Sequence, residues 1–472
     1  MKKEERRKIM SVVVRRAVLL ALLFIIHSSF FILHSSLGAP RHHTAAQKDP
    51  DRLVALGTAC LRQGDIAGAE SYYDQCYHQK RITTGMICLA GDIALAKNDA
   101  EQADYHYGRA IYFDPRDPLG YWHYADMHKK KEPALAVQKL KQLRLYRDDC
   151  RVEHKIAEVW YAGNKVKEAA TAYDSIPIDS LDRDELVSYA MSTYLLQDYQ
   201  KSATIALHGR SVSPRDLVFN RLVMYDYTDM KQYDKALEAS VDLFEHSERK
   251  AEADSVGDRE KTTFTYLDYI YYGYVLNGVG RYEEGIAQFN RALRLNGDRT
   301  DVLLAISKAY ENVGDYPSAI SHYKLYMDKL TEDDRTPYVV YELGRLYYAQ
   351  GTNAQQDKEM TDEKRQALKL ADQTFAELER MRPDSYLGVY WRARTNVALD
   401  PDTERGLAKP YYQKVVDMTE TTGGGAPLVE AYKYMAYYYY VKHDRQNMLK
   451  YADKILDIDP TDDYALRLST AF

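Results

Sequence analysis

Tryptophan, cysteine and net positive charge are all scarce in this chain. Its 472 residues include 3 Trp and 4 Cys, and the formal net charge is −6. None of the cysteines forms a C-x-x-C pair, so the sequence indicates neither a zinc site nor a thioredoxin-like redox centre. An acidic balance argues against non-specific binding of nucleic acid, which needs a basic surface.

Motifs for catalysis are missing as well. The sequence has no H-E-x-x-H, no G-x-S-x-G and no phosphate-binding loop. The glycines of "NGVGRYEEG" (277–285) follow a helical pattern, whereas a dinucleotide site needs a preceding strand. The glycines of "TTGGGAP" (421–427) form a connector without a neighbouring Lys-Ser or Lys-Thr. We therefore expect no catalytic residue, no bound metal and no cofactor, in a protein that is not an enzyme.

The first 39 residues differ from the rest of the chain. A basic start is followed by the apolar run "AVLLALLFIIHSSFFIL" (17–33) and then by small residues. This order is typical of a secretory signal peptide, but the run is also close to the roughly 20 residues of a membrane anchor. Both interpretations export the remainder to the periplasmic side of a bacterial inner membrane, because the positive flank stays in the cytoplasm. Without residues 1–39 the net charge changes from −6 to −11.

One spacing recurs from residue 51 onwards. A small residue, taken as the origin, is followed by a small residue at +12, an aromatic at +16, a small or apolar residue at +19 and often proline at +24. A turn such as "GD" or "ND" lies about seven residues after the origin. The clearest copy consists of Gly91, Ala103, Tyr107, Ala110 and Pro115. Further origins are Gly57, Ala157, Gly273, Ser307 and Gly344, and weaker copies start at Tyr124, Ala190, Met224, Ala393 and Ala436.

This spacing predicts stacked helix hairpins. Small residues at the origin and at +12 let two antiparallel helices approach closely, while large residues at −4, −1 and +3 share one helix face with the origin. The aromatic at +16 fills the space against the next hairpin, and proline ends the second helix. One hairpin cannot bury its apolar face alone, so about eleven repeats of about 34 residues must stack into an all-α array.

The pattern resembles the tetratricopeptide repeat (TPR) family over about 51–472. The resemblance implies a right-handed superhelical solenoid whose first helices line a concave face, and that face usually binds peptides or protein partners. Members of the family are rarely enzymes. The repeat at Tyr124 has a bulky origin, and Met448 replaces the small +12 residue of the last repeat. These two hairpins are therefore expected to splay or shift.

Composition divides the chain further. Residues 40–50 form a linker, 51–247 a first repeat array, and 263–472 a second. The charged insert 248–262 between the arrays is either a hinge or an extension of two helices. The insertion 352–366 widens a turn of the second array, as an exposed loop or a longer second helix.

Two cysteines, Cys60 and Cys76, fall on facing core positions of the first hairpin. Export permits a disulfide between them. The favoured alternative is a pair of buried free thiols that act as small apolar side chains.

The helix face at −3, +1 and +4, with −6 at its start, is expected to line the concave surface. In the last repeats this face combines Tyr with Arg or Lys, which is the composition of binding hot spots. The candidate partner-binding residues are Tyr338, Tyr341, Arg345, Tyr348, Tyr390, Arg394, Lys433, Tyr437 and Tyr440. We hypothesise that they bind an extended protein segment with acidic or C-terminal carboxylate groups. The alternative is that Tyr is simply common at these positions.

The run "YKYMAYYYYVKHD" (432–444) shows how one helix divides its tyrosines. With Ala436 as origin, Tyr432 and Tyr439 lie on the core face, whereas Tyr437 and Tyr440 lie on the concave face. The other two, at 434 and 438, point toward the preceding hairpin or solvent.

The sequence thus favours a non-catalytic protein–protein interaction scaffold at the periplasmic side of the membrane, in envelope or secretion assembly. A second interpretation is a carbohydrate- or peptidoglycan-binding envelope protein, because tyrosine faces also stack on sugars. A third, an enzyme with a site inside the solenoid, has no clustered acid–base pair to support it.

Overall fold

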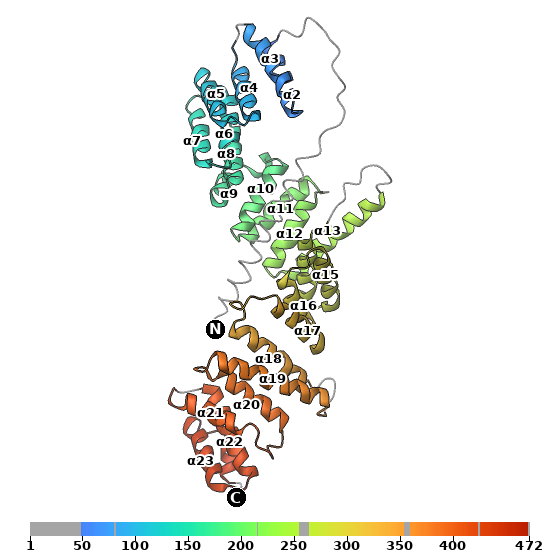
Figure 1. Cartoon of the computed structure of the whole chain (residues 1–472), viewed down its shortest axis with the longest axis vertical. Helices are drawn as coiled ribbons and strands as arrows, with labels where there is room; N and C mark the ends of the chain where they lie inside the picture. The colour runs from blue at the N-terminus through green and yellow to red at the C-terminus, as the bar shows by residue number, and fades with distance from the viewer. Residues whose placement is uncertain are drawn as a thin grey trace. The chain divides into compact units, whose positions relative to one another are not determined.

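The computed structural model describes residues 49–79, 82–214, 216–253, 264–353, 359–422 and 425–470 (Figure 1). In these ranges the chain forms 23 α-helices, two short 3-10 helices and no strand. From α2 to α13 and from α14 to α24, consecutive helices pack against one another, which confirms the predicted all-α class of stacked hairpins. None of the helices described is long and apolar enough to cross a membrane. The predicted signal or anchor, 1–39, lies outside the described residues.

The chain divides into two compact units, unit 1 up to Thr262 and unit 2 from Thr263. The described part of unit 1 forms six hairpins: α2 (Pro50–Arg62) with α3 (Ile66–His78), α4 (Thr84–Ala96) with α5 (Ala100–Phe113), α6 (Pro118–His128) with α7 (Pro133–Leu143), α8 (Arg151–Ala162) with α9 (Val166–Asp174), α10 (Arg183–Leu195) with α11 (Tyr199–Val212), and α12 (Leu217–Asp229) with α13 (Tyr233–Ala253). A 3-10 turn, η3 (Ile178–Ser180), follows α9.

The described part of unit 2 forms five hairpins and a terminal helix. They are α14 (Tyr266–Gly278) with α15 (Tyr282–Leu295), α16 (Thr300–Asn312) with α17 (Tyr316–Asp328), α18 (Pro337–Thr352) with α19 (Asp362–Met381), α20 (Tyr386–Leu399) with α21 (Lys409–Thr419), α22 (Gly425–Val441) with α23 (Arg445–Ile458), and α24 (Asp463–Ser469); η4 (Glu420–Thr422) follows α21. The repeat pattern missed α24, which packs on α23 and α22 and covers the last hairpin.

Close approach of the two helices in a hairpin depends on glycine at the origin. A Cβ on Gly273 would lie 2.5 Å from the ring of Phe289, and one on Gly344 would lie 2.6 Å from the ring of Phe375. Gly91 packs against the ring of Tyr107 in the same way. The aromatic at +16 therefore covers the origin of its own hairpin, in addition to filling the space toward the next hairpin as predicted.

Tyr124, the bulky origin of its repeat, cannot make the glycine contact of the other hairpins. Its ring lies 4.4 Å from that of His128, centre to centre, and stays buried. A different close approach occurs at Gly120 of the same helix, where a Cβ would lie 3.0 Å from the backbone nitrogen of Ile111 on α5, the second helix of the preceding hairpin. In the last repeat, Met448 is fully buried among the core residues of its hairpin.

The turn residue at +7 adopts positive φ in eight hairpins of the described chain. These residues are Gly64, Asn98, Asn164, Gln197, Lys231, Gly280, Gly314 and His443. The left-handed conformation reverses the chain and places the next residue at the start of the second helix. In several hairpins that next residue is aspartate, and the Asp65 side chain, for example, accepts the Gly68 N–H at 2.8 Å. The shared offset also places three of the weak repeats, those at Ala190, Met224 and Ala436, in register, whereas the repeats at Tyr124 and Ala393 have no left-handed residue at +7.

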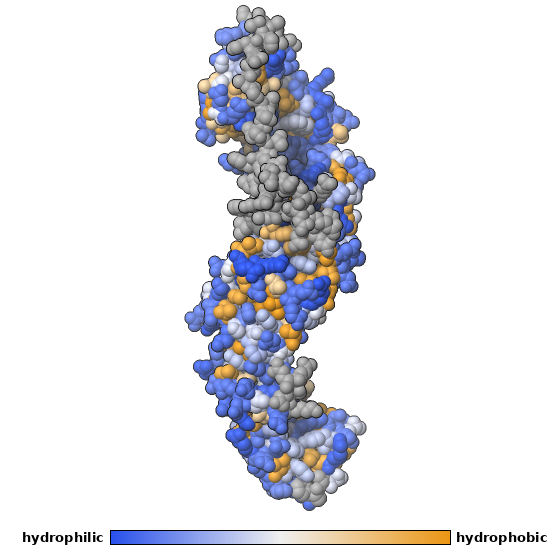
Figure 2. All heavy atoms as spheres, turned by 90° about the vertical axis from the view of Figure 1, so that its right-hand side faces the viewer, coloured by the Kyte–Doolittle hydropathy of each residue, from blue (hydrophilic) through white to orange (hydrophobic). Residues whose placement is uncertain are grey.

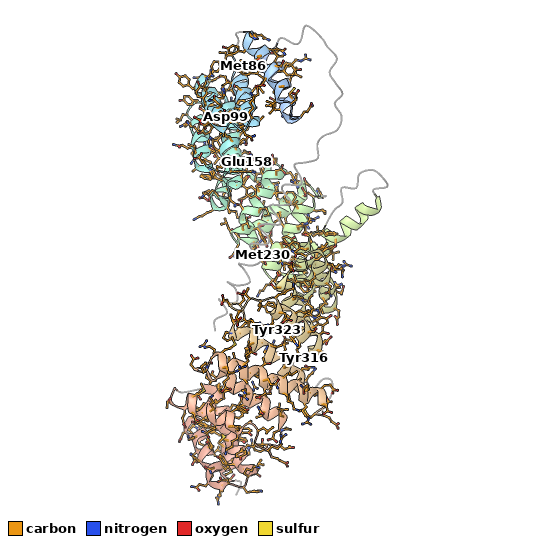
Figure 3. All side chains as sticks on the ribbon, viewed as in Figure 1. Met86, Asp99, Glu158, Met230, Tyr316 and Tyr323 are labelled. Carbon is orange, nitrogen blue, oxygen red and sulfur yellow. The ribbon has the colours of Figure 1, made fainter. Side chains whose placement is uncertain are left out.

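Tyrosine hydroxyls satisfy their own hydrogen bonds inside the stack. Tyr323 of α17 (Figure 3) donates to the carbonyl oxygen of Val339 on α18 at 3.1 Å. Tyr107 donates to the Asp92 carboxylate at 2.7 Å, and burial raises the pKa of that phenol. A ring that packs and a hydroxyl that bonds suit half-buried sites, which explains the 43 Tyr of the sequence. On the face shown in Figure 2, hydrophilic residues predominate, and the exposed apolar residues lie in separate groups.

The two sequence insertions are described only in part. Helix α13 continues to Ala253, so the first residues of the insert 248–262 are helical. Residues 254–262 lie outside the described ranges, and a hinge there stays a prediction. Helix α19 runs for 20 residues from Asp362 to Met381, so the end of the insertion 352–366 belongs to a long second helix. Its centre, 354–358, also lies outside the described ranges.

The two cysteines of the first hairpin are free thiols in the structure. Cys76 is buried and donates from Sγ to the carbonyl oxygen of Pro50 at 3.6 Å. Cys60 is only half-buried and packs in a different part of the core, beside Ala69 and Leu89. Both thiols are thus free, as in the favoured alternative, but only Cys76 is buried as that alternative expected.

A buried carboxyl group stands out in unit 1. Asp226 on α12 is fully buried, and neither of its carboxyl oxygens has a hydrogen-bond partner among the described residues. Burial raises its pKa to about 9, and the charges of Asp229 and Asp198 act in the same direction. Only Ser202 opposes them, and its hydroxyl already donates to the Ala190 carbonyl at 3.1 Å. Asp226 is therefore a neutral acid at pH 7.

We predict that Gln197→Gly stabilises unit 1. Gln197 is exposed and has φ of 68°, a conformation that costs a non-glycine residue roughly 1–2 kcal/mol. After the added freedom of the unfolded glycine is subtracted, the gain is about 0.5–1 kcal/mol by urea unfolding. The matched control is Gln200→Gly in the first turn of α11, which should give no gain and a loss of up to about 1 kcal/mol. Equal losses for both variants would contradict the prediction.

We also predict that Asp226→Asn removes a pH dependence of stability. The folded pKa of about 9 exceeds the ordinary 3.8, so folded Asp226 keeps a proton that unfolded Asp226 releases. Stability from this group is therefore complete below about pH 4 and falls by up to about 1.4 kcal/mol per pH unit as the pH rises toward 9.

Urea unfolding at pH 5 and pH 8 measures this slope. Asp226→Asn should lose less stability than the original chain over that interval. Asp234→Asn, an exposed change of the same charge on α13, is the control and should follow the original chain. Parallel pH curves for all three proteins would refute the assignment.

Candidate partner-binding surface

Five of the nine candidate residues gather around one tryptophan in unit 2. The ring of Trp391 on α20 lies 5.8 Å from that of Tyr341 and 5.3 Å from that of Tyr348, both on α18. Its neighbour Tyr390 lies 6.4 Å away, and Arg394 stacks over the indole at 5.0 Å. Edge-to-face rings at these separations attract one another. The ring of Tyr338 lies 6.4 Å from that of Tyr341 and so adjoins the group. We call these six residues the Trp391 cluster: Tyr338, Tyr341, Tyr348, Tyr390, Trp391 and Arg394.

Sequence reasoning missed Trp391 itself. It lies at −2 from the origin Ala393, a position that belongs to neither the core face nor the concave face of the repeat scheme. In the structure it stacks on the buried ring of Phe375 at 5.4 Å and so joins the core to the surface. One signal in the sequence could have identified it: Trp391 is one of only 3 Trp, and it stands between the candidates Tyr390 and Arg394.

Glu430 of α22 organises the polar edge of the Trp391 cluster. Its carboxylate accepts from the hydroxyls of Tyr390 at 2.6 Å and Tyr412 at 2.7 Å, and its Oε1 lies 3.4 Å from Nε of Arg394. Burial and the bond to Glu430 raise the pKa of Tyr390 to about 12, and they raise the pKa of Tyr412 further. Both phenols are therefore neutral hydrogen-bond donors. Glu430 lies at −6 from Ala436, at the start of the concave face, as Tyr338 does in its own repeat. It was absent from the sequence-based set because that set kept only Tyr, Arg and Lys.

Arg345 is already paired inside the chain. Its Nη1 lies 2.5 Å from Oε1 of Glu311 on α16, and its Nη2 lies 3.0 Å from Oε2 of Glu342. Burial alone would raise the pKa of Glu311, but the hydrogen bonds from Arg345 and Lys308 lower it below its usual value. Glu311 is therefore charged, and the guanidinium is neutralised before any partner arrives.

The last three candidates form a second group, the Tyr437 patch. Nζ of Lys433 lies 2.7 Å from Oδ2 of Asp462 and 5.9 Å from the ring of Tyr464 on α24. The rings of Tyr437 and Tyr440 stack at 6.3 Å, and each side chain is 38% exposed. Helix α24 thus contributes an acid and a ring that the repeat pattern did not predict. The Tyr437 patch is the part of the candidate set that presents aromatic rings to solvent.

The other tyrosines of the run 432–444 pack inside unit 2. Tyr432 is buried, and the ring of Tyr439 stacks on Tyr451 of α23 at 5.9 Å, as predicted for the core face. Tyr434 faces the preceding hairpin, where its ring lies 4.7 Å from Tyr412. Tyr438 faces the same way, with Lys409 of α21 at 5.1 Å from its ring. The prediction for both is resolved in favour of the preceding hairpin.

We predict that Glu430→Gln destabilises unit 2 by about 1–2 kcal/mol, since hydrogen bonds to charged groups are worth roughly 1.5–3 kcal/mol and the glutamine retains part of them. Urea unfolding measures the loss. Combining the change with Tyr390→Phe should cost less than the sum of the two single changes, because both remove the same bond. Strict additivity would contradict the role given to Glu430.

No known family model matches the chain, and no curated protein gives a significant match. Among solved structures, the C-terminal part of a TPR repeat-containing protein from Cytophaga hutchinsonii is 26% identical, with a TM-score of 0.46; the match covers 60% of this chain and 98% of that one. A tetratricopeptide repeat protein from Parabacteroides merdae is 13% identical, with a TM-score of 0.34, over 55% of this chain and 98% of that one.

A third similar structure is MamA from MSR-1, at 19% identity and a TM-score of 0.32, over 38% of this chain and 97% of that one. The repeat class itself rests on this chain's own geometry: origin glycines under +16 rings, left-handed turns at +7 and pairwise stacked helices. The chain is an all-helical array of tetratricopeptide-like hairpins, as the sequence predicted.

Proposed function

We propose that the chain is a non-catalytic interaction scaffold that binds an extended protein segment across α18, α20 and α22 of unit 2. One observation carries the proposal. Tyr437 and Tyr440 present stacked, partly exposed rings on a helix whose other tyrosines are packed. Rigid aromatic area with hydroxyl tips is the most frequent component of protein-binding hot spots.

The ion pairs within the chain change what we expect the ligand's acidic groups to contribute. Arg345, Arg394 and Lys433 each have an acid partner within the chain, so an incoming carboxylate must displace Glu311, Glu430 or Asp462. Such an exchange gains little net energy, because one ion pair replaces another. In this proposal the rings supply most of the affinity, and the acidic groups of the segment fix its orientation. We expect the affinity to change less than about threefold between low and physiological salt.

The location belongs to the same proposal. The basic and apolar start of the sequence supports export, with the repeats on the periplasmic side of an inner membrane, free or anchored. A scaffold there would serve the assembly of an envelope or secretion complex. No nucleic acid is expected as a partner, given the charge of −11 beyond residue 39.

Carbohydrate is the second candidate ligand. The rings of Tyr437 and Tyr440 are within 22° of parallel, which suits stacking on a sugar or peptidoglycan chain. Retention on peptidoglycan, without a protein partner, would favour this candidate.

Photocrosslinking in intact cells tests the proposal. We expect p-benzoylphenylalanine at position 437 to capture a protein partner that mass spectrometry identifies. Tyr437→Ser combined with Tyr440→Ser should then reduce capture about tenfold or more, the size of a hot-spot loss. These changes are preferable to Arg345→Glu, which would set three carboxylates together at Glu311 and Glu342.

The matched control changes Tyr105 and Tyr112 to Ser on α5 of unit 1, whose side chains are 57% and 89% exposed. This control should capture the partner normally. Unchanged capture by the 437/440 variant, or an equal loss with the control, would refute the proposed surface.

A further inference from the structure

Unit 1 contains a hollow of about 520 Å³ that the proposed function does not use. It is lined by residues of α7, α8 and α9, within one and a half hairpins. Its volume falls within the roughly 300–1,000 Å³ of small ligand sites. None of the residues predicted to bind a partner lies there.

The floor of the hollow is apolar and fixed in place. Ile156 and Trp160 of α8, one turn apart, form it together with Ala172 of α9. Ile156 is a buried member of the core of this region, and the other two pack against that core. The indole is half-buried, so part of its surface remains open. An apolar floor of this kind favours an apolar or aromatic side chain over water.

The rim of the hollow is charged, with an excess of cations. Arg144 is paired with Glu153 across the hollow's edge. Lys141 and Lys167 are exposed and have no ion-pair partner within the described ranges, and the Glu168 carboxylate likewise has none. Apart from the Arg144–Glu153 pair, the rim thus has two ammonium groups, on Lys141 and Lys167, and one carboxylate, on Glu168. This differs from the Trp391 cluster and the Tyr437 patch, where the candidate cations are paired.

We propose that this hollow binds a protein segment in which an aromatic side chain is flanked by carboxylates. The side chain lies on Ile156 and Trp160, and the flanking carboxylates pair with Lys141 and Lys167. Glu168 disfavours a basic segment and so adds selectivity. The site is independent of the unit 2 surface, because it uses other residues and its lysines are unpaired within the described ranges, whereas the candidate cations of unit 2 are paired.

Titration of the full chain with the peptide Ac-Asp-Phe-Asp-NH₂ tests the site. Binding should be saturable by calorimetry and should change the fluorescence of Trp160, a change that Trp160→Phe removes. Two other peptides separate the contribution of the aromatic side chain from that of the flanking carboxylates. Ac-Asp-Ala-Asp-NH₂ lacks the apolar anchor and Ac-Lys-Phe-Lys-NH₂ has the wrong charge, so both should bind much more weakly.

Lys141→Gln combined with Lys167→Gln should weaken Ac-Asp-Phe-Asp-NH₂ about three- to tenfold, as expected for two exposed ion pairs. The matched control is Lys130→Gln with Lys165→Gln, an equal loss of charge outside the hollow. These surface changes keep the test valid even if Trp160→Phe fails to fold.

Three results would overturn the proposal: no saturable binding of Ac-Asp-Phe-Asp-NH₂, equal binding of the lysine peptide, or an equal loss in the control variant. Affinity at the hollow should also fall with salt, unlike affinity at the unit 2 surface. Failure at one site therefore remains distinguishable from failure at the other.

Discussion

The contact between an origin glycine and the aromatic ring of the facing helix is the constraint on which the hairpins depend. At Gly273 and Gly344 a single added carbon would meet the Phe289 or Phe375 ring well inside contact distance. This approach brings the two helices together and lets the +16 ring reach the next hairpin as well, as Phe375 does with Trp391. The same ring therefore closes one hairpin and helps to position the following one, which is how a local pattern becomes a continuous core.

Polar links join successive hairpins. Glu158 of α8 (Figure 3) accepts from Lys129 of α6 at 2.7 Å and from Lys155 at 2.8 Å. In unit 2, Glu430 accepts from Tyr390 of the preceding repeat at 2.6 Å. Such links satisfy groups that stacking would otherwise leave half-desolvated. They also pair many of the charged side chains on the surface. Most cations beside aromatic rings in unit 2 therefore have an acid nearby.

Binding surfaces arise where this pairing is incomplete or where stacking ends. Tyr437 and Tyr440 remain partly exposed near the C-terminal end of unit 2, beside the short helix α24. In unit 1, the hollow over Trp160 keeps two lysines without an acid partner among the described residues. The first surface is aromatic and nearly neutral, whereas the second is apolar at its floor and cationic at its rim. Charge therefore contributes more to ligand binding at the second surface than at the first.

The sequence by itself determined the helical class, the hairpin register and the role of most tyrosines in 432–444, because these follow from spacing along one helix. The +7 turn, for example, holds even for the weak repeat at Met224, where Lys231 adopts φ of 59°. Only the tertiary structure decided which charges were already paired and which rings were covered. Arg345 and Glu311 are 34 residues apart, and the position of Trp391 between α18 and α20 depends on how the hairpins stack. Helical periodicity carries no information about such contacts, since they join different repeats.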